Sequence, residues 1–286
     1  MGASTFGIIG GEPFVRSDMV ELMAAIKNKN MNGSITTNGT LLDQERVKKI
    51  VDMNWDLIRI SIDGIEDTHD NLRGKKGSFS KLMNTLDLFD EYGGSKPTIE
   101  INTVLNKENF DEIPELIELA HNYDIKRIFL LPVIEFNQEA REIKLKGNKN
   151  IEKPLKKAER ICNKYGIENN IEEVTRDELY SKSNETDEII EDQVIPCFVP
   201  WYSISINSKG IATPCSQFED KFGVDVRENS LEEVWKSGAF RRLREKISSK
   251  DLPKTCSKCC APLLKENEEI RKNLDNKTER NLAERY

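Results

Sequence analysis

Four cysteines in the second half of the chain are the residues best suited to chemistry. They follow the pattern Cys-x12-Gly-x4-Cys, a gap of 40 residues and then Cys-x2-Cys, at Cys197, Gly210, Cys215, Cys256 and Cys259. The other two cysteines of the chain are Cys162 and Cys260. Four thiolates are the ligand set of an iron–sulfur cubane or of a structural zinc ion. The spacing therefore predicts one tetrathiolate metal site.

Spacing also ranks the alternatives. A zinc ribbon usually has two short Cys-x2-4-Cys pairs, whereas 17 residues separate the first pair here, so zinc is the weaker interpretation. Disulfides are weaker still, because no signal-peptide pattern is present and the neighbouring Cys259 and Cys260 have no matching partners. Unliganded thiols stay open, as does Cys260 in place of Cys259. We expect Cys162, on a helix near 151–165, to be a small buried apolar residue.

The stretch around the first two cysteines also has a recognisable local pattern. Ile204 and Ile206 alternate with polar residues, which predicts a half-buried strand over 202–206, and 207–210 has the composition of a turn. With the helix start at 230–235, the sequences CFVPWYSISINSKGIATPC and SLEEVWKSGAFRRLR resemble the SPASM/twitch domain of radical S-adenosylmethionine (SAM) enzymes. Lys265 stands where a full SPASM domain would continue with a cysteine. The resemblance thus implies the shorter twitch form, with one auxiliary [4Fe–4S] cluster on Cys197, Cys215, Cys256 and Cys259.

Predicted strands and helices alternate along the first half of the chain, and this arrangement could position a second site. We expect strands from Phe6 and over 34–37, 57–62, 98–104 and 128–131, and helices near 16–28, 43–52, 78–92 and 109–122. Regular alternation predicts a parallel sheet with its helices outside, and the polar residues at the carboxyl ends of the strands then line a site.

The strand ends are Gly10–Pro13, Thr37–Thr40, Ser61–Gly64, Asn102 with Asn106, and Leu131-Pro132. Together with His69-Asp70 and Arg73, which follow the third of them, they resemble the radical SAM partial barrel over residues 6–135. The resemblance implies that Gly10, Gly11, Glu12 and Pro13 hold the methionine amino group of SAM. It also implies that Ser61 and Asp63 lie near the ribose, Arg73 near the methionine carboxylate and the backbone of Leu131 near the adenine. From the residues alone, Asp63 and Asn38 fit turn-forming or helix-capping roles equally well, and His69 fits a surface polar residue.

One feature departs from the family. Radical SAM enzymes hold their catalytic [4Fe–4S] cluster with Cys-x3-Cys-x2-Cys after the first barrel strand, and no cysteine precedes Cys162 here. We therefore expect a partial (β/α) barrel that lacks its first β–α unit, followed by a small α+β domain. The expectation is either a truncated enzyme or a chain that has lost the chemistry, and SAM and a catalytic cluster are expected only with the missing segment.

Composition limits the partners. The net charge of −7 argues against nucleic acid. No apolar run reaches about 20 residues and the mean hydropathy is −0.59, so we expect a cytoplasmic protein with no membrane partner. We expect a barrel at 1–135, a charged connecting region at 136–193, a cluster domain at 194–264 and a charged helical tail at 265–286.

The function implied by the resemblance is generation of a 5′-deoxyadenosyl radical that modifies a peptide, sugar or small-molecule substrate. A low-potential donor such as flavodoxin or ferredoxin would supply the electron. Two alternatives stay open: a non-catalytic iron–sulfur or scaffold protein, and a zinc-stabilised binding module.

Overall fold

The structure is a computed structural model that describes residues 2–94, 97–133, 137–145, 149–180, 197–216, 222–249, 251 and 269–273. The chain divides into two compact units, which are Gly2–Lys182 and, with Met1, Ser183–Tyr286. Cys256, Cys259, Cys260 and Lys265 lie outside the described residues, as does most of the expected tail, of which 269–273 are helical.

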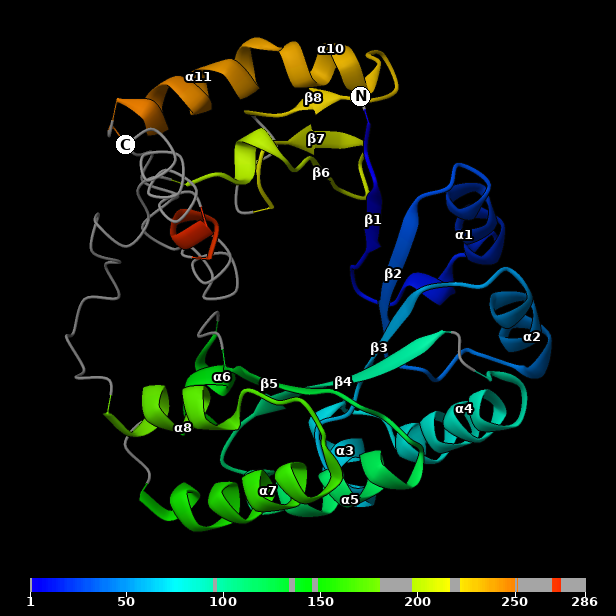
Figure 1. The fold of residues 1–286 in the computed structure, drawn as a ribbon, viewed down its shortest axis with the longest axis vertical. Coiled ribbons are helices and arrows are strands. Elements are labelled where there is room, and N and C mark those ends of the chain that lie inside the picture. Colours follow the sequence, from blue (N-terminus) through cyan, green and yellow to red (C-terminus); the bar gives the residue numbers. More distant parts are fainter. Residues whose placement is uncertain are drawn as a thin grey trace, which may run out of the picture. The chain divides into compact units, whose positions relative to one another are not determined.

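The first unit is built on a five-stranded parallel sheet whose strands follow the chain order β1-β2-β3-β4-β5 (Figure 1). The strands are β1 (Thr5–Ile8), β2 (Asn32–Thr37), β3 (Leu57–Ser61), β4 (Thr98–Leu105) and β5 (Ile128–Pro132). All four pairings are parallel. The α/β fold class and the five strands predicted from the sequence are confirmed.

Eight helices belong to this unit within the described ranges: α1 (Met19–Lys27), α2 (Gln44–Asp52), α3 (Glu66–Leu72), α4 (Ser78–Tyr92), α5 (Ile113–Asn122), α6 (Gln138–Glu142), α7 (Glu152–Tyr165) and α8 (Ile171–Tyr180). Single 3-10 turns occur at Pro13–Val15 and Lys149–Ile151. Helices α1, α2, α4, α5 and α7 match the predicted segments, whereas α3 was not expected. No described helix is both long and apolar enough to cross a bilayer.

The two faces of the sheet differ in character. One face carries the fully buried core residues Ile35, Ile58, Ile60, Ile101 and Leu130, which pack under the helices. The opposite face carries polar side chains that are mostly half-buried, namely Ser34, Thr36, Arg59, Ser61 and Asn102. Since side chains alternate along a strand, the register aligns Thr36, Arg59 and Glu100 in one row across β2, β3 and β4.

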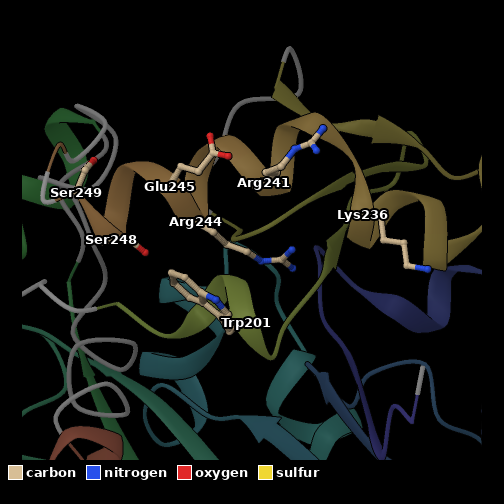
Figure 2. Close-up of a pocket in the computed structure, with 7 residues that line it drawn as sticks. All are labelled: Trp201, Lys236, Arg241, Arg244, Glu245, Ser248 and Ser249. Carbon is tan, nitrogen blue, oxygen red and sulfur yellow. The ribbon is translucent and has the colours of Figure 1, made fainter.

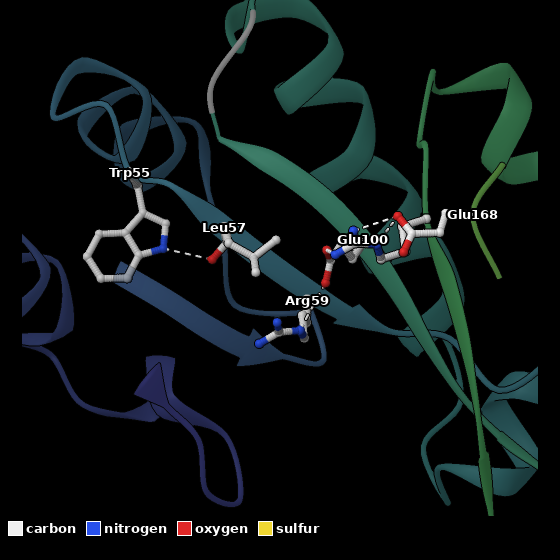
Figure 3. Close-up of polar contacts among 6 residues, drawn as sticks. Trp55, Leu57, Arg59, Glu100 and Glu168 are labelled. Atoms are coloured by element: carbon white, nitrogen blue, oxygen red, sulfur yellow. Dashed lines mark hydrogen bonds and ion pairs between the residues drawn. The ribbon is translucent and has the colours of Figure 1, made fainter. Parts of the chain in front are cut away.

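Trp55 anchors the start of β3 in this core. The indole is fully buried, and its Nε1 donates to the carbonyl of Leu57 at 3.0 Å (Figure 3). Gly33 makes room for the ring, because a Cβ at that position would lie 2.1 Å from an indole carbon. The close approach of β2 to the indole therefore requires glycine.

The predicted connecting region at 136–193 contributes α6, α7 and α8 to this unit. Asn170 extends the hydrogen bonding of the sheet: it accepts from the amide of Leu130 and donates to its carbonyl, both at 2.8 Å. Cys162 on α7 is fully buried, and burial raises the pKa of its thiol to about 12. The prediction that Cys162 is a buried apolar residue is confirmed.

The second unit contains a small antiparallel sheet of order β6-β7-β8, and its described residues include the helices α10 and α11. Its elements are β6 (Ser205–Ile206), β7 (Ile211–Thr213), β8 (Val224–Asp225), α10 (Leu231–Lys236) and α11 (Gly238–Ser248). Gly210 has φ +78° in the predicted turn, a left-handed conformation that favours glycine. A capping box between Ser230 and Glu233 starts α10.

The strand predicted in this unit is longer than the one observed. The strand expected over 202–206 is limited to Ser205–Ile206, because a 3-10 turn at Val199–Trp201 comes before it and holds the amide of Ser203. Ile204 packs against the small core of Ala212, Val234 and Phe240, whereas Ile206 is 43% exposed. The predicted apolar face therefore holds for Ile204 and is wrong for Ile206.

Candidate functional site

The glycine turn after β1 leaves its backbone open. Gly10 has φ +149°, and no atom lies within 4 Å of where a Cβ would be at Gly10 or Gly11. Both glycines are exposed. A ligand can therefore approach the main chain closely at this turn.

Glu12 ties this turn to the end of β2. Its Oε1 accepts from the amide of Phe14 at 3.0 Å and from Thr37 Oγ1 at 2.8 Å. Its Oε2 accepts from the amide of Asn38 at 2.7 Å. Because both carboxylate oxygens are used within the chain, Glu12 shapes the turn, whereas the backbone of Gly10 and Gly11 stays open. Asn38 forms a turn as well, since its Oδ1 accepts from the amide and hydroxyl of Thr40.

Asp63 lies at the end of β3 with its side chain only 9% exposed. Its Oδ1 accepts from the amide of Val104 at 2.8 Å, and its Oδ2 lies 2.8 Å from Arg73 Nη2. Burial raises the pKa of Asp63, while the charge of Arg73 and the Val104 amide oppose that rise. The carboxylate therefore orients Arg73, whose side chain is 32% exposed and open to a second partner.

His69 forms a hydrogen bond with the backbone of Asp63. Its Nδ1 accepts from the amide of Asp63 at 3.1 Å, and its ring meets the edge of Phe79 at 5.8 Å between centroids. The side chain is fully buried, and burial, with help from Arg73, lowers the pKa of His69 to about 4. The surface interpretation of His69 is thus wrong, and the imidazole is neutral at physiological pH.

Two residues that hold the Asp63 loop were missed from the sequence. Asn109 Nδ2 donates to the carbonyls of Asp63 and Val104, both at 2.9 Å. Glu112 accepts from the amide of Ile65 at 2.7 Å and from Thr68 Oγ1 at 2.6 Å. The signal was available, since both residues follow Asn106 at intervals of three directly after β4.

Ser61 and Leu131 complete the predicted SAM residues. Both are half-buried. Ser61 is paired in register with Asn102, and Leu131 with Val104. Because Asn102 and Val104 point to the same face of β4, Ser61 and Leu131 share the polar face of the sheet. The structure thus brings the predicted residues to the carboxyl end and polar face of one sheet.

A row of charged side chains crosses the same face further from the strand ends (Figure 3). Glu100 is nearly inaccessible, with 4% of its side chain exposed. Its Oε2 accepts from Arg59 Nε at 3.0 Å and its Oε1 from Arg127 Nη1 at 2.6 Å. Arg127 also donates through Nε and Nη2 to Glu168.

In the second unit, Cys197 and Cys215 are half-buried. Cys197 precedes the 3-10 turn at Val199–Trp201, and Cys215 follows β7, where its carbonyl accepts from Thr213 Oγ1 at 3.0 Å. The described ranges contain no group of three or more metal-ligating side chains, and the predicted ligands Cys256 and Cys259 lie outside those ranges. Thiol donors in one small unit suit an iron–sulfur cluster or zinc.

Arg244 organises the helices next to these cysteines. Its Nε donates to the carbonyl of Pro200 at 2.9 Å and its Nη1 to that of Trp235 at 3.0 Å, and the guanidinium lies 4.2 Å from the Trp235 ring centroid. An open pocket of about 790 Å³ adjoins it, lined by Trp201, Lys236, Arg241, Arg244, Glu245, Ser248 and Ser249 (Figure 2). Arg244 thus links α11 to the turn that follows Cys197.

Comparison with known proteins agrees with this geometry. Residues 1–120 match the radical SAM superfamily, and residues 197–260 match SPASM, an iron–sulfur cluster-binding domain. Fe-coproporphyrin III synthase of Methanosarcina barkeri is 37% identical over 119 residues, which are 42% of this chain and 29% of that protein. PqqA peptide cyclase of Rhizobium meliloti is 26% identical over 268 residues, which are 90% of this chain and 68% of that protein.

Solved structures share the fold. anSMEcpe with bound AdoMet superposes with a TM-score of 0.59 at 20% identity, over 91% of this chain and 70% of that one. SuiB of Streptococcus suis bound to S-adenosylmethionine gives a TM-score of 0.58 at 21% identity, over 84% and 56%. [4Fe–4S] clusters and SAM are the cofactors that these two domains imply. The chain therefore carries a radical SAM domain at residues 1–120 and a SPASM iron–sulfur cluster-binding domain at residues 197–260.

Proposed function

We propose that this chain takes part in radical SAM modification of a peptide, with SAM bound at the carboxyl ends of β1, β2 and β3. The observation that carries the proposal is the Asp63–Arg73 pair. A buried carboxylate presents a half-exposed guanidinium at the same edge of the sheet as the open backbone of Gly10 and Gly11. SAM carries a carboxylate and an ammonium, which suit a guanidinium and backbone carbonyls respectively.

The residues take distinct roles in this proposal. The backbone of Gly10 through Pro13 receives the methionine amino group, and Arg73 receives the carboxylate. The hydroxyl of Ser61 lies on the ribose side, and the backbone around Leu131 meets the adenine. Glu12 and Asp63 act as positioning residues, because their carboxylate oxygens already accept hydrogen bonds within the chain.

The metal centres are assigned by the chemistry of their donors. Cys197, Cys215, Cys256 and Cys259 would hold the auxiliary [4Fe–4S] cluster, which would supply electron transfer near the substrate. A catalytic cluster bound by the family's Cys-x3-Cys-x2-Cys loop would supply the electron that cleaves SAM. The residues of this chain would bind and orient SAM against that cluster.

A peptide is the substrate class named for the relatives that match most of this chain. The named relatives include a PqqA peptide cyclase, and SuiB is also known bound to its precursor peptide SuiA. The anSMEcpe structures include one with the Cp18Cys peptide. A flavodoxin or ferredoxin donor and a cytoplasmic location stay predictions.

A titration with SAM and with decarboxylated SAM tests the binding site, followed by NMR at the amides of Gly10, Gly11 and Asp63. We expect weak binding of SAM without the catalytic cluster, and about tenfold weaker binding in Arg73→Gln. Decarboxylated SAM should bind both proteins equally, because it lacks the group that Arg73 receives.

Arg16→Gln is the matched control, because Arg16 is an exposed arginine that pairs with Asp18 on the surface. It should bind SAM as the wild type does. Unchanged shifts at all three amides, or equal loss of both ligands in Arg73→Gln, would contradict the proposed site. The binding or scaffold alternative would then gain support.

A further inference from the structure

Arg59 occupies a specific place on the polar face of the sheet. It lies two residues before Ser61 on β3, so both side chains point to the same face about 7 Å apart along the strand. In register it stands between Thr36 on β2 and Glu100 on β4. Arg59 is therefore one step along the strand from the residue assigned to the ribose side of SAM.

The two arginines that bind Glu100 differ in how many of their guanidinium nitrogens are hydrogen-bonded. Arg127 uses Nη1 for Glu100 and uses Nε and Nη2 for Glu168, so its fork is fully engaged. Arg59 uses only Nε. Its two terminal nitrogens have no hydrogen-bond partner in the part of the chain that the structure describes, and Figure 3 shows them pointing away from Glu100.

The guanidinium of Arg59 is held by Glu100 and is still accessible to a second partner. The side chain of Glu100 is 4% exposed and that of Arg59 is 36% exposed, so the pair holds a guanidinium at the surface of the polar face with its stem fixed. A guanidinium fixed in this way is pre-organised for a second, bidentate partner. The planar fork of arginine matches a carboxylate.

We propose that Arg59 binds a carboxylate of the peptide substrate and so acts as a specificity determinant. This inference rests on the proposed function, because it places the peptide on the polar face beside SAM. The carboxylate is either an aspartate or glutamate side chain or the free C-terminus of the peptide. Both present the same two oxygens to the Nη atoms of Arg59.

Peptide titrations with the full chain test the inference without SAM turnover. The probes are acetyl-Gly-Ala-Glu-Ala-Gly-amide, its Gln counterpart, and acetyl-Gly-Ala-Ala-Ala-Gly with a free or an amidated C-terminus. Binding is followed by NMR at the arginine Nε–H resonances. We expect about tenfold tighter binding of one carboxylate peptide than of its neutral counterpart, and the arm that shows it identifies the source of the carboxylate.

Variants separate recognition from folding. The preference should disappear in Arg59→Gln, and it should be reduced in Arg59→Lys, which keeps the positive charge beside Glu100 but loses the fork. Arg241→Gln, at an exposed arginine of the second unit, should keep the full preference. Thermal unfolding of each variant reports whether it is folded.

The outcomes distinguish this inference from the proposed function. A carboxylate preference that persists in folded Arg59→Gln, or no preference in either arm, overturns the role of Arg59. If SAM still shifts Gly10, Gly11 and Asp63 in that case, the SAM site stands and only the substrate inference falls. If SAM has no effect while the preference depends on Arg59, the carboxylate site stands and the proposed enzyme function falls.

Discussion

Arg73 Nη2 lies 2.8 Å from Asp63 Oδ2, and this contact joins a half-exposed guanidinium to a carboxylate that is 9% exposed. Burial raises the pKa of Asp63 and the charge of Arg73 opposes that rise. The charge of Arg73 thus favours the ionised carboxylate, and the carboxylate in turn keeps Arg73 in place. Stability and ligand binding are coupled at this pair.

Arg73→Gln should therefore lower the free energy of unfolding by on the order of 2 kcal/mol at pH 7, because it leaves a buried carboxylate without its counter-ion. Loss of the guanidinium raises the pKa of Asp63 further, so protonation relieves the variant as the pH falls. The deficit should shrink between pH 7 and pH 5, as measured by urea denaturation. Arg16→Gln should unfold at the wild-type midpoint at both pH values, because its pair with Asp18 is exposed to solvent. A deficit that is the same at both pH values would contradict the assigned charge on Asp63.

His69 should make the first unit sensitive to acid. Its pKa is lowered from 6.5 to about 4 in the fold, so between these values the unfolded chain binds a proton that the native chain does not. Stability therefore falls as the pH falls through this window, by up to about 1.4 kcal/mol per pH unit. His69→Gln should remove this part of the slope.

His121→Gln is the matched control, because His121 is the only other histidine of the chain and stacks on Tyr165 at an exposed position. The variant should keep the wild-type slope in urea denaturation series from pH 7 to pH 4. Asp63 titrates with the opposite sign, but it is present in all three proteins and cancels in the comparison. Equal slopes in the wild type and His69→Gln would show that His69 is not buried as a neutral base.

The parallel sheet was predictable because its pattern is local. Apolar strands such as Leu57–Ser61 and amphipathic helices such as Gln44–Asp52 each carry their own periodicity. Helix α3 escaped prediction because Glu66–Leu72 is short and mostly polar, and the contacts of Thr68 and His69 with Glu112 and Asp63 stabilise it. Glu112 is 44 residues from Thr68 in the sequence, so no local pattern reveals that contact.

In the candidate site, too, some features could be predicted from local sequence and others depend on tertiary contacts. Residue type and order predicted the Gly10–Pro13 turn, and the family resemblance pointed to Asp63 and Arg73. Whether a carboxylate faces a ligand or its own backbone depends on tertiary contacts, and Glu12 accepts from Thr37 and Asn38 on the next strand. The pairing of Arg59 with Glu100 depends on strand register, which the sequence does not specify by itself.

Gly33→Ala should destabilise the first unit by about 1–3 kcal/mol through overpacking. A Cβ at Gly33 would lie 2.1 to 2.6 Å from three ring carbons of Trp55. That ring is fully buried and held by its bond to the Leu57 carbonyl, so it has little room to shift. Gly11→Ala is the control, because a Cβ at Gly11 meets nothing within 4 Å, and its unfolding midpoint should match the wild type. If Gly33→Ala is as stable as Gly11→Ala, the packing of Trp55 against β2 is wrong.

The iron and sulfide content of the protein tests the assignment of the metal site. Anaerobically reconstituted protein should bind about four irons and four sulfides per chain, with broad visible absorbance, because four thiolates hold one cubane. Cys215→Ala with Cys256→Ala should abolish that content. Cys162→Ala is the matched cysteine control: it removes a thiol that is fully buried in the first unit, so it should cost stability without changing iron or sulfide.

Stoichiometric zinc without sulfide would favour the zinc-stabilised alternative. Iron that survives the double substitution would place the cluster on other ligands, because two thiolates alone leave half of a cubane's iron sites without a protein ligand.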